Sequence, residues 1–236
     1  MLSVKNFSKA YSNGKNVVSN ISLEVKEGDI FGFIGHNGAG KTTTIKSIVG
    51  ILEFTEGEIT LDGLSVKKNP IEYKKQIAYI PDNPDIYESL TGIQYLSFIA
   101  DIYGVEKEER EKLIREYGDR FELTKSLGGL ISSYSHGMKQ KLAIISALIH
   151  KPKLFILDEP FVGLDPKASH TLKEIMKECC KNGSAIFFST HVLEVAEKLC
   201  TKISIIKDGE IVASGKTEEV IGNRSLEDIF MGLIDK

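Results

Sequence analysis

The sequence predicts an α/β fold with a parallel sheet at its centre. In the last third of the chain, strand-like apolar runs alternate with helical stretches, at residues 154–157, 169–180, 185–189, 192–200 and 203–206. Earlier, an apolar run at residues 30–34 leads through a glycine-rich loop into a helical pattern at residues 41–51. Asp208-Gly209 predicts a tight hairpin before residues 210–213. Strands that alternate with helices are typical of a parallel sheet whose faces are covered by helices.

The N-terminal third contains strands that bury one side. Apolar and polar residues alternate at residues 21–26 and 59–61, and the second run ends at the turn pair Asp62-Gly63. A period of two places successive side chains on opposite faces of a strand. This third of the chain is therefore predicted to contribute an antiparallel sheet with one face exposed to water.

Residues 85–150 have a helical pattern. Thr91 predicts a helix start because Gln94, three residues later, can complete a capping box, and Gly104 predicts the end. The apolar residues expected on one face of this helix are Ile93, Leu96, Ala100 and Tyr103. The charged stretch 106–115 is expected to form an exposed helix. Together these elements predict an inserted helical lobe.

Composition excludes several classes of protein. With 236 residues, 42% of them hydrophobic, the chain can form one large domain or two lobes that share a core. Its 30 basic and 33 acidic residues nearly balance and form no dense basic block, so a nucleic-acid partner is not expected. Cys179, Cys180 and Cys200 have neither the number nor the spacing of a disulfide framework or zinc site, which favours a reducing cytoplasm.

No stretch of the sequence predicts a membrane span. The longest apolar run, residues 142–149, is far shorter than the about 20 residues that a spanning helix needs. The N-terminus lacks the long apolar stretch of a secretory signal, so export of this chain is not expected. A role at a membrane would require a partner subunit.

A phosphate-binding loop follows the buried strand at residues 30–34. The motif GxxxxGK[ST] is matched in full by Gly35, His36, Asn37, Gly38, Ala39, Gly40, Lys41 and Thr42. Its glycines let successive backbone N–H groups surround phosphates at a helix N-terminus. Lys41 is predicted to reach the outer phosphates, Thr42 to bind Mg²⁺ and Thr43 to add a donor. The alternative is a glycine-rich turn that merely precedes a helix.

Two carboxylates end the strand at residues 154–157. Parallel strands deliver such groups to the carboxyl edge of a sheet, where ligands bind. Asp158 is predicted to bind magnesium, and Glu159 to polarise the attacking water, which contributes about 10²- to 10⁴-fold to a rate. A solvated strand end is the alternative, which the phosphate loop disfavours.

These motifs together resemble the ABC ATPase family. The loop GHNGAGKTT, the strand LFILDEP, Gly163-Leu164-Asp165 and Ser189-Thr190-His191 agree with that family in order and spacing. The segment YSHGMKQK, residues 134–141, is similar to the family signature LSGGQ. In it Ser135 and Gly137 match, whereas Tyr134, His136 and Met138 replace Leu, Gly and Gln, a form that resembles bacterial exporter-type ATPases.

The resemblance implies a P-loop NTPase fold. Its parts would be a RecA-type core with an N-terminal antiparallel β-subdomain, formed by residues 1–82 and 151–236, and an inserted helical subdomain, residues 83–150. It also implies a head-to-tail dimer, in which the signature residues Ser135, His136, Gly137 and Met138 face the ATP of the partner subunit. Hydrolysis would then require two chains, either identical or different.

The resemblance also implies roles for single residues. His191 would contact the γ-phosphate and orient the water with Glu159, and Asp165 would belong to the D-loop. Tyr11 lies where an aromatic residue stacks on adenine, although plain packing is equally compatible with its position. Asp82 occupies the usual position of the Q-loop glutamine, where its carboxylate could bind magnesium. His150 and His170 are interpreted as surface or packing residues.

The predicted function is MgATP hydrolysis that powers an ABC transporter, an exporter, through docking to separate membrane subunits at the cytoplasmic face. One alternative is an ABC-type ATPase that acts on DNA or ribosomes. Such a protein would be expected to carry coiled-coil insertions, tandem ATPase halves or basic arms, and this sequence has none. A second alternative, an ATP sensor without turnover, is disfavoured by the presence of both Glu159 and His191.

Overall fold

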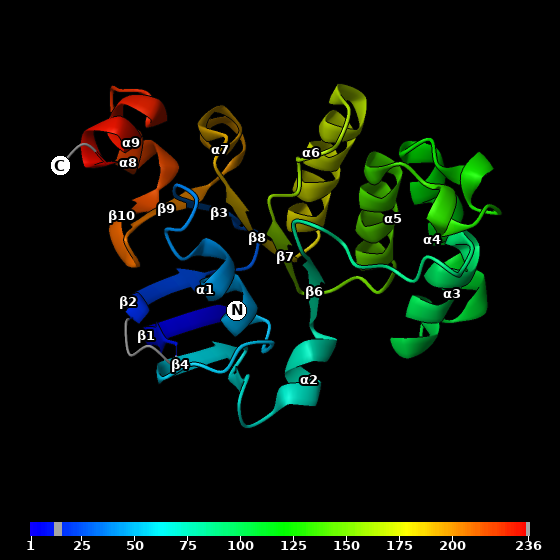
Figure 1. Ribbon diagram of the computed structural model, residues 1–236, viewed down its shortest axis with the longest axis horizontal. Helices are drawn as coiled ribbons and strands as arrows, with labels where there is room; N and C mark the ends of the chain where they lie inside the picture. Colours follow the sequence, from blue (N-terminus) through cyan, green and yellow to red (C-terminus); the bar gives the residue numbers. More distant parts are fainter. Residues whose placement is uncertain (12–15, 235–236) are drawn as a thin grey trace.

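The computed structural model describes residues 1–11 and 16–234 and contains a six-stranded sheet at its centre (Figure 1). The strand order is β10-β9-β3-β8-β7-β6. Its members are β3 (Ile30–Ile34), β6 (Ile77–Ile80), β7 (Leu154–Asp158), β8 (Ala185–Thr190), β9 (Lys202–Lys207) and β10 (Glu210–Lys216). All neighbouring pairs are parallel except β9 and β10. The carboxyl ends of five strands therefore meet at one edge.

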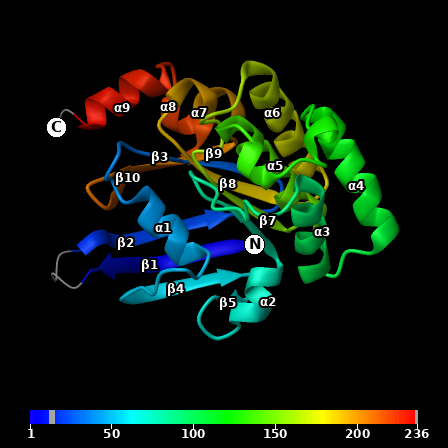
Figure 2. The same cartoon turned by 45° about the vertical axis from the view of Figure 1, so that its right-hand side comes forward.

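A second, antiparallel sheet lies on the other side of helix α1 (Lys41–Ile48), in the strand order β2-β1-β4-β5. Its strands are β1 (Leu2–Ala10), β2 (Asn16–Val25), β4 (Glu56–Leu61) and β5 (Leu64–Ser65), followed by α2 (Pro70–Lys75). One hydrophobic cluster joins this sheet, α1 and the face of the central sheet that α1 covers. It includes Phe7 of β1, Ile45 of α1 and Phe187 of β8. The phosphate-loop helix is thus held between two sheets (Figure 2).

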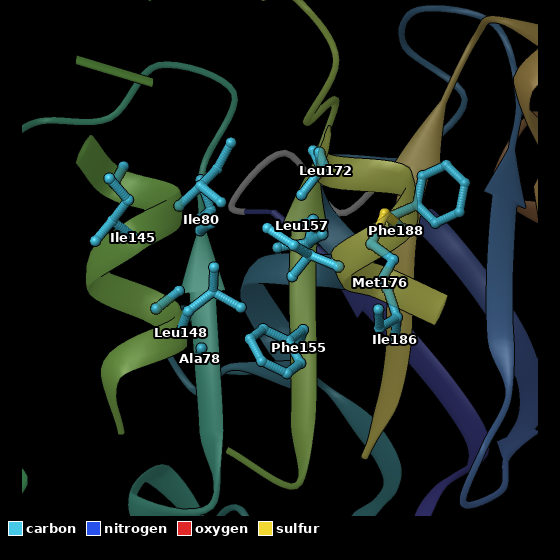
Figure 3. Close-up of a cluster of buried hydrophobic side chains, with 14 of the residues drawn as sticks. Ala78, Ile80, Ile145, Leu148, Phe155, Leu157, Leu172, Met176, Ile186 and Phe188 are labelled. Atoms are coloured by element: carbon cyan, nitrogen blue, oxygen red, sulfur yellow. The ribbon is translucent and has the colours of Figure 1, made fainter. Parts of the chain in front are cut away.

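The opposite face of the central sheet packs against helices. Figure 3 shows side chains of β6, β7 and β8 meeting Leu148 of α5 (His136–Ile149) and Met176 of α6 (Pro166–Lys181). Beyond α5 lie α3 (Gly92–Ile102) and α4 (Lys107–Arg120), which form the lobe at the right of Figure 1. The remaining helices are α7 (Leu193–Leu199), α8 (Thr217–Ile221) and α9 (Leu226–Ile234).

The predicted α/β class, with its antiparallel N-terminal sheet and inserted helices, is confirmed. Thr91 and Gln94 form the predicted capping box, and both Asp-Gly pairs occupy turns with positive φ between antiparallel strands. One prediction of burial was wrong. Ile93 does not lie on the buried face of α3, because its side chain is 40% exposed.

The helix at residues 41–51 was predicted too long. It ends at Ile48, because Gly50 then adopts a positive φ of 71° that does not continue an α-helix. Across the described residues, none of the helices has both the length and the apolar character that crossing a bilayer requires.

Candidate functional site

A pocket opens where the carboxyl ends of the parallel strands meet. The loop after β3 holds the glycine-rich motif, and the segments after β6, β7 and β8 hold Asp82, Glu159 and His191. The pocket is lined by Val17, His36, Asn37, Gly38, Gly40, Lys41, Thr42, Thr43, Asp82, Asp158 and Glu159. Residues that are distant in sequence therefore share one cavity because the sheet is parallel.

The glycine-rich loop has a backbone that requires glycine. Gly38 and Gly40 have φ values of 86° and 107°, in a region that residues with a side chain rarely adopt. At Gly40 a Cβ atom would also lie 3.1 Å from the carbonyl oxygen of Val17. The loop then enters α1 directly, and the free N–H groups of a first helical turn are suited to binding an anion.

The Lys41 side chain lies inside this loop. Its Nζ donates to the carbonyl oxygens of Gly35 at 2.6 Å and His36 at 3.2 Å. Nζ also lies 3.7 Å from Oε1 of Glu159, and the side chain is only 7% exposed. A buried cation with these partners is placed to bind an anionic group in the pocket.

Oxygen ligands suited to Mg²⁺ gather beside Lys41. The hydroxyl of Thr42 donates to Oδ2 of Asp158 at 2.9 Å, and Asp82 lines the same pocket. Within residues 1–11 and 16–234, no group of three or more His, Cys, Asp or Glu side chains could form a complete metal cage. Magnesium commonly uses one or two carboxylates and completes its shell with water and substrate phosphates. The donor set therefore fits Mg²⁺ bound together with a nucleotide.

Glu159 and His191 form a second pair of polar groups at the rim of the pocket. Nδ1 of His191 lies 3.0 Å from Oε2 of Glu159, whose side chain is largely buried. Glu159 has a φ of 50°, so the chain turns sharply after Asp158. The two neighbouring carboxylates therefore point to different partners, Asp158 to Thr42 and Glu159 to Lys41 and His191.

The hydroxyl of Ser189 connects these carboxylates. It donates to Oδ1 of Asp158 at 2.5 Å and accepts a hydrogen bond from the backbone N–H of Glu159 at 3.0 Å. The sequence motif Ser189-Thr190-His191 directed attention to His191 alone. The signal for Ser189 is the strand register, because Asp158 and Ser189 are paired positions of β7 and β8.

Tyr11 lies next to the loop but outside the pocket lining. Its hydroxyl is 3.5 Å from Oγ1 of Thr43, and its ring is 42% exposed with Nζ of Lys9 at 5.1 Å from the ring centroid. An exposed aromatic ring at this position offers a flat apolar surface to a planar ligand. Val17, which sequence reasoning did not identify, lines the pocket from β2.

The signature residues lie away from this pocket, at the N-terminus of α5. Ser135 caps the helix by accepting a hydrogen bond from the N–H of Met138 at 3.3 Å. Ser135 and His136 are exposed, and neither they nor Gly137 and Met138 line the pocket. The Ser135 and His136 side chains are thus at the surface of the chain, outside the lining of its own pocket.

The segment after Glu159 packs beside the signature helix. Asp165 caps α6 by accepting from the N–H of Ala168 at 2.8 Å, and it forms an ion pair with Lys141 of α5 at 2.7 Å. The hydrogen bond from Lys141 is the main cause that lowers the pKa of Asp165 below its ordinary value. The side chain of Asp165 is therefore engaged within its own chain.

Comparison with known proteins identifies relatives that match along the whole chain. A family model described as "ABC transporter" matches residues 18–162. The ABC-type transporter ATP-binding protein EcsA of Bacillus subtilis (strain 168) is 38% identical over 238 residues, which cover 99% of this chain and 96% of EcsA.

Two solved structures extend this similarity. "Structure of ATP binding subunit of ABC transporter" matches with a TM-score of 0.95 at 37% identity and covers 99% of both chains. The dimeric structure of a post-hydrolysis state of the ATP-binding cassette MJ0796, bound to ADP and Pi, matches with a TM-score of 0.82 at 25% identity. That match covers 92% of this chain and 99% of the other.

Proposed function

Because this chain belongs to the ABC transporter family as an ATP-binding subunit, we propose that it hydrolyses MgATP in a dimer and drives export through separate membrane subunits. Subunits of this family are ATPases, and the related cassette MJ0796 is known as a dimer in a post-hydrolysis state. The observation that carries the proposal is the meeting of Lys41, Asp158 and Glu159 at one pocket.

The residues of this pocket have different roles in phosphoryl transfer. Phosphates bind to the loop N–H groups and Lys41, where positive potential stabilises the charge of the transferring group. Thr42, Asp158 and Asp82 hold Mg²⁺, which neutralises phosphate charge when it is bound with ATP. Glu159 polarises the attacking water. His191, whose Nδ1 lies 3.0 Å from the Glu159 carboxylate, contacts the γ-phosphate and orients the same water.

A second chain supplies the remaining donors. Ser135 and His136 of the signature are exposed, and none of the residues from Ser135 to Met138 lines the pocket of its own chain. This supports a head-to-tail dimer in which the signature binds the partner's γ-phosphate. The N-terminus of α5 carries positive potential toward that phosphate. ATP binding then closes the dimer and hydrolysis opens it. The two chains are identical or a related pair.

An exposed apolar surface on the helical lobe supports docking to a membrane subunit. The side chain of Tyr87 is 60% exposed and that of Phe98 is 41% exposed, and their rings make an edge contact with centroids 5.8 Å apart. Ile102, one helical turn beyond Phe98, is also exposed. Exposed apolar side chains that lie together are typical of a protein contact. Asp82 lies on the loop that leads into this lobe, residues 83–150. The lobe would transmit the closure of the dimer to the membrane subunit.

The direction of transport and the location follow from this assignment. The support for export is the form of the signature, Tyr134-Ser135-His136-Gly137-Met138, which resembles that of bacterial exporter-type ATPases. ATP is abundant in the cytoplasm, so the proposed location is the cytoplasmic face of the membrane, where the chain is held by its partner subunits.

The proposal is tested with Glu159→Gln, which removes the water-polarising carboxylate and keeps the side chain's size. We expect ATP binding to persist, turnover to fall by about 10²-fold or more, and an ATP-bound dimer to accumulate. Sedimentation in the presence of ATP detects the dimer, and an assay of phosphate release measures turnover. Glu194→Gln, at an exposed position of α7, is the matched control. Wild-type turnover in Glu159→Gln would contradict the catalytic role.

Docking is tested separately by identifying which multi-span membrane protein copurifies with this chain. Tyr87→Asp places a charge in the exposed aromatic surface and should reduce copurification while basal hydrolysis is retained. Met231→Asp, at an exposed position of α9, is the control. Equal recovery of the membrane protein with both variants would remove this surface from the proposed contact.

A further inference from the structure

Ser189 is a buried hydroxyl to which neither the sequence motifs nor the proposed function gives a role. It is the penultimate residue of β8, is 0% exposed, and lies directly beside Asp158 in the sheet. A serine hydroxyl has one hydrogen to donate and oxygen lone pairs to accept with. Here the hydrogen goes to Oδ1 of Asp158 at 2.5 Å, so a lone pair is left to face the N–H of Glu159 at 3.0 Å.

Glu159, whose backbone N–H donates to Ser189, has a strained backbone conformation. Glu159 has a φ of 50°, a left-handed conformation that glycine adopts readily and that other residues adopt at a cost. Such a conformation persists only where the surrounding structure holds it, and it is frequent at functional sites. The hydrogen bond from the Glu159 N–H to Ser189 is one such restraint.

The strained turn determines where the Glu159 carboxylate points. Its Oε1 lies 3.7 Å from Nζ of Lys41, and its Oε2 lies 3.0 Å from Nδ1 of His191. Relaxation of the backbone toward negative φ would swing this side chain away from both partners. Asp158 would keep its place, because its second oxygen is bonded independently to Thr42.

We propose that Ser189 is a positioning residue for hydrolysis, whose hydroxyl holds Glu159 in the left-handed conformation that directs its carboxylate into the pocket. The inference rests on the proposed function, because it assumes that Glu159 polarises the attacking water. It predicts a loss in turnover rather than in nucleotide binding, since the phosphate-binding Lys41 and the carboxylate of Asp158 do not depend on the hydrogen bond between Ser189 and the Glu159 N–H.

The test compares Ser189→Ala and Ser189→Thr with the wild type. Ser189→Ala should lower kcat by roughly 10- to 100-fold, because the orientation of the base is lost. ATP affinity by calorimetry should stay within about threefold, because Asp158 loses the hydrogen bond from Ser189 but keeps the one from Thr42. Ser189→Thr retains the hydroxyl and should recover most of the turnover. An unchanged kcat in Ser189→Ala, or a loss of affinity that accounts for the whole defect, would overturn the inference.

A matched control separates positioning from stability. Ser204 of β9 is equally buried in the same sheet, and its hydroxyl bonds to that of Ser214 at 2.6 Å. Ser204→Ala should lower the unfolding temperature without lowering kcat. If Ser204→Ala lost as much turnover as Ser189→Ala at matched unfolding temperature, the effect would be one of stability and the positioning role would be rejected.

A double variant tests whether Ser189 acts on turnover through Glu159. In a Glu159→Gln background, Ser189→Ala should change the residual turnover by less than about threefold, because the group that Ser189 positions is already disabled. If Ser189→Ala lowered turnover as much in this background as in the wild type, Ser189 would not act through Glu159. A wild-type protein without ATPase activity would instead contradict the proposed function, so the two failures are distinguishable.

Discussion

Lys41 and Glu159 form an ion pair inside the nucleotide pocket, with 3.7 Å between Nζ and Oε1. The same ammonium donates to the carbonyl oxygen of Gly35 at 2.6 Å, so the loop itself holds the cation in place. A phosphate that enters the loop meets a cation that is already oriented. In the proposed function, Lys41 binds phosphate and Glu159 activates water, so the two roles belong to residues in contact, and substitutions can separate them.

Lys41→Ala should weaken ATP binding itself. A hydrogen bond to a charged group contributes about 1.5–3 kcal/mol, so affinity should fall roughly 10- to 100-fold. Calorimetry measures the affinity directly. Lys46→Ala removes the same charge from the same helix at a position outside the pocket lining and should bind ATP normally. Unchanged ATP affinity in Lys41→Ala would contradict phosphate binding by this lysine.

Ser135→Arg should leave ATP binding intact and abolish turnover that depends on the dimer, because the bulky cation would project into the partner's phosphate site. Phosphate release at increasing protein concentration measures this loss. Ser135 also caps α5, so its replacement should lower stability by about 1 kcal/mol. Ser135→Ala removes the same cap without adding a cation and serves as the control. If both variants lost turnover equally, the steric argument would fail.

Mixing two inactive variants tests the head-to-tail dimer. A dimer of one Ser135→Arg chain and one Lys41→Ala chain retains one intact composite site, whereas each variant alone retains none. Partial phosphate release after mixing is expected. Activity of the mixture no greater than that of the separate variants would leave the shared site without support.

Local sequence signals predicted the elements that local chemistry determines. The capping box of Thr91 and Gln94 and the hairpin at Asp208-Gly209 depend on residues a few positions apart, and both are present. The burial of Ile93 was predicted wrongly, because helical periodicity defines a stripe but not its centre. The neighbours of α3 in space determine that Tyr95 rather than Ile93 is buried.

In the pocket, too, features that depend on neighbouring residues could be predicted, and features that depend on distant residues could not. The glycine-rich loop could be placed from its sequence, since its conformation depends on its own glycines. The bond between Ser189 and Glu159 could not, because it follows from the pairing of β7 with β8 and from a turn with positive φ. Residues 31 positions apart, such as Asp158 and Ser189, become partners only through the sheet.

Stability should depend on pH through His150, which follows the last turn of α5. Its ring stacks on Tyr103 with centroids 3.7 Å apart, and its Nε2 lies 3.2 Å from the carbonyl oxygen of Ile77. Burial lowers the pKa of His150 from its ordinary value of 6.5, although bonds to backbone carbonyls oppose the shift. The unfolded chain therefore takes up a proton first as the pH falls, and stability present above pH 6.5 is lost below it.

Denaturant unfolding at several pH values measures this effect. The free energy of unfolding should fall more steeply below pH 6.5 in the wild type than in His150→Phe, which keeps an aromatic ring on Tyr103 but cannot be protonated. His170→Phe, at an exposed position of α6, should retain the wild-type slope. Parallel pH profiles for the wild type and His150→Phe would contradict the assignment.

Asp82 adds a second carboxylate to the pocket that Asp158 lines, at the position that the sequence resemblance assigns to the Q-loop glutamine. Burial raises the pKa of the Tyr79 phenol to about 12, and the negative charges of Asp158 and Asp82 add to this effect. Two carboxylates favour a divalent cation more than one carboxylate and an amide do, and they repel an ATP phosphate that carries no metal.

Asp82→Gln should therefore raise the magnesium concentration needed for half-maximal hydrolysis, by roughly threefold to tenfold, and weaken the penalty for binding ATP without metal. Because the loop leads into the helical lobe, transport should fall more than basal hydrolysis when the membrane partner is present. Asp85→Asn, in the same loop but outside the pocket lining, is the matched control. Titration of ATPase activity against magnesium, alone and with the partner, measures both effects. Superimposable titration curves and an unchanged ratio of transport to hydrolysis would mean that Asp82 is only a solvated loop carboxylate.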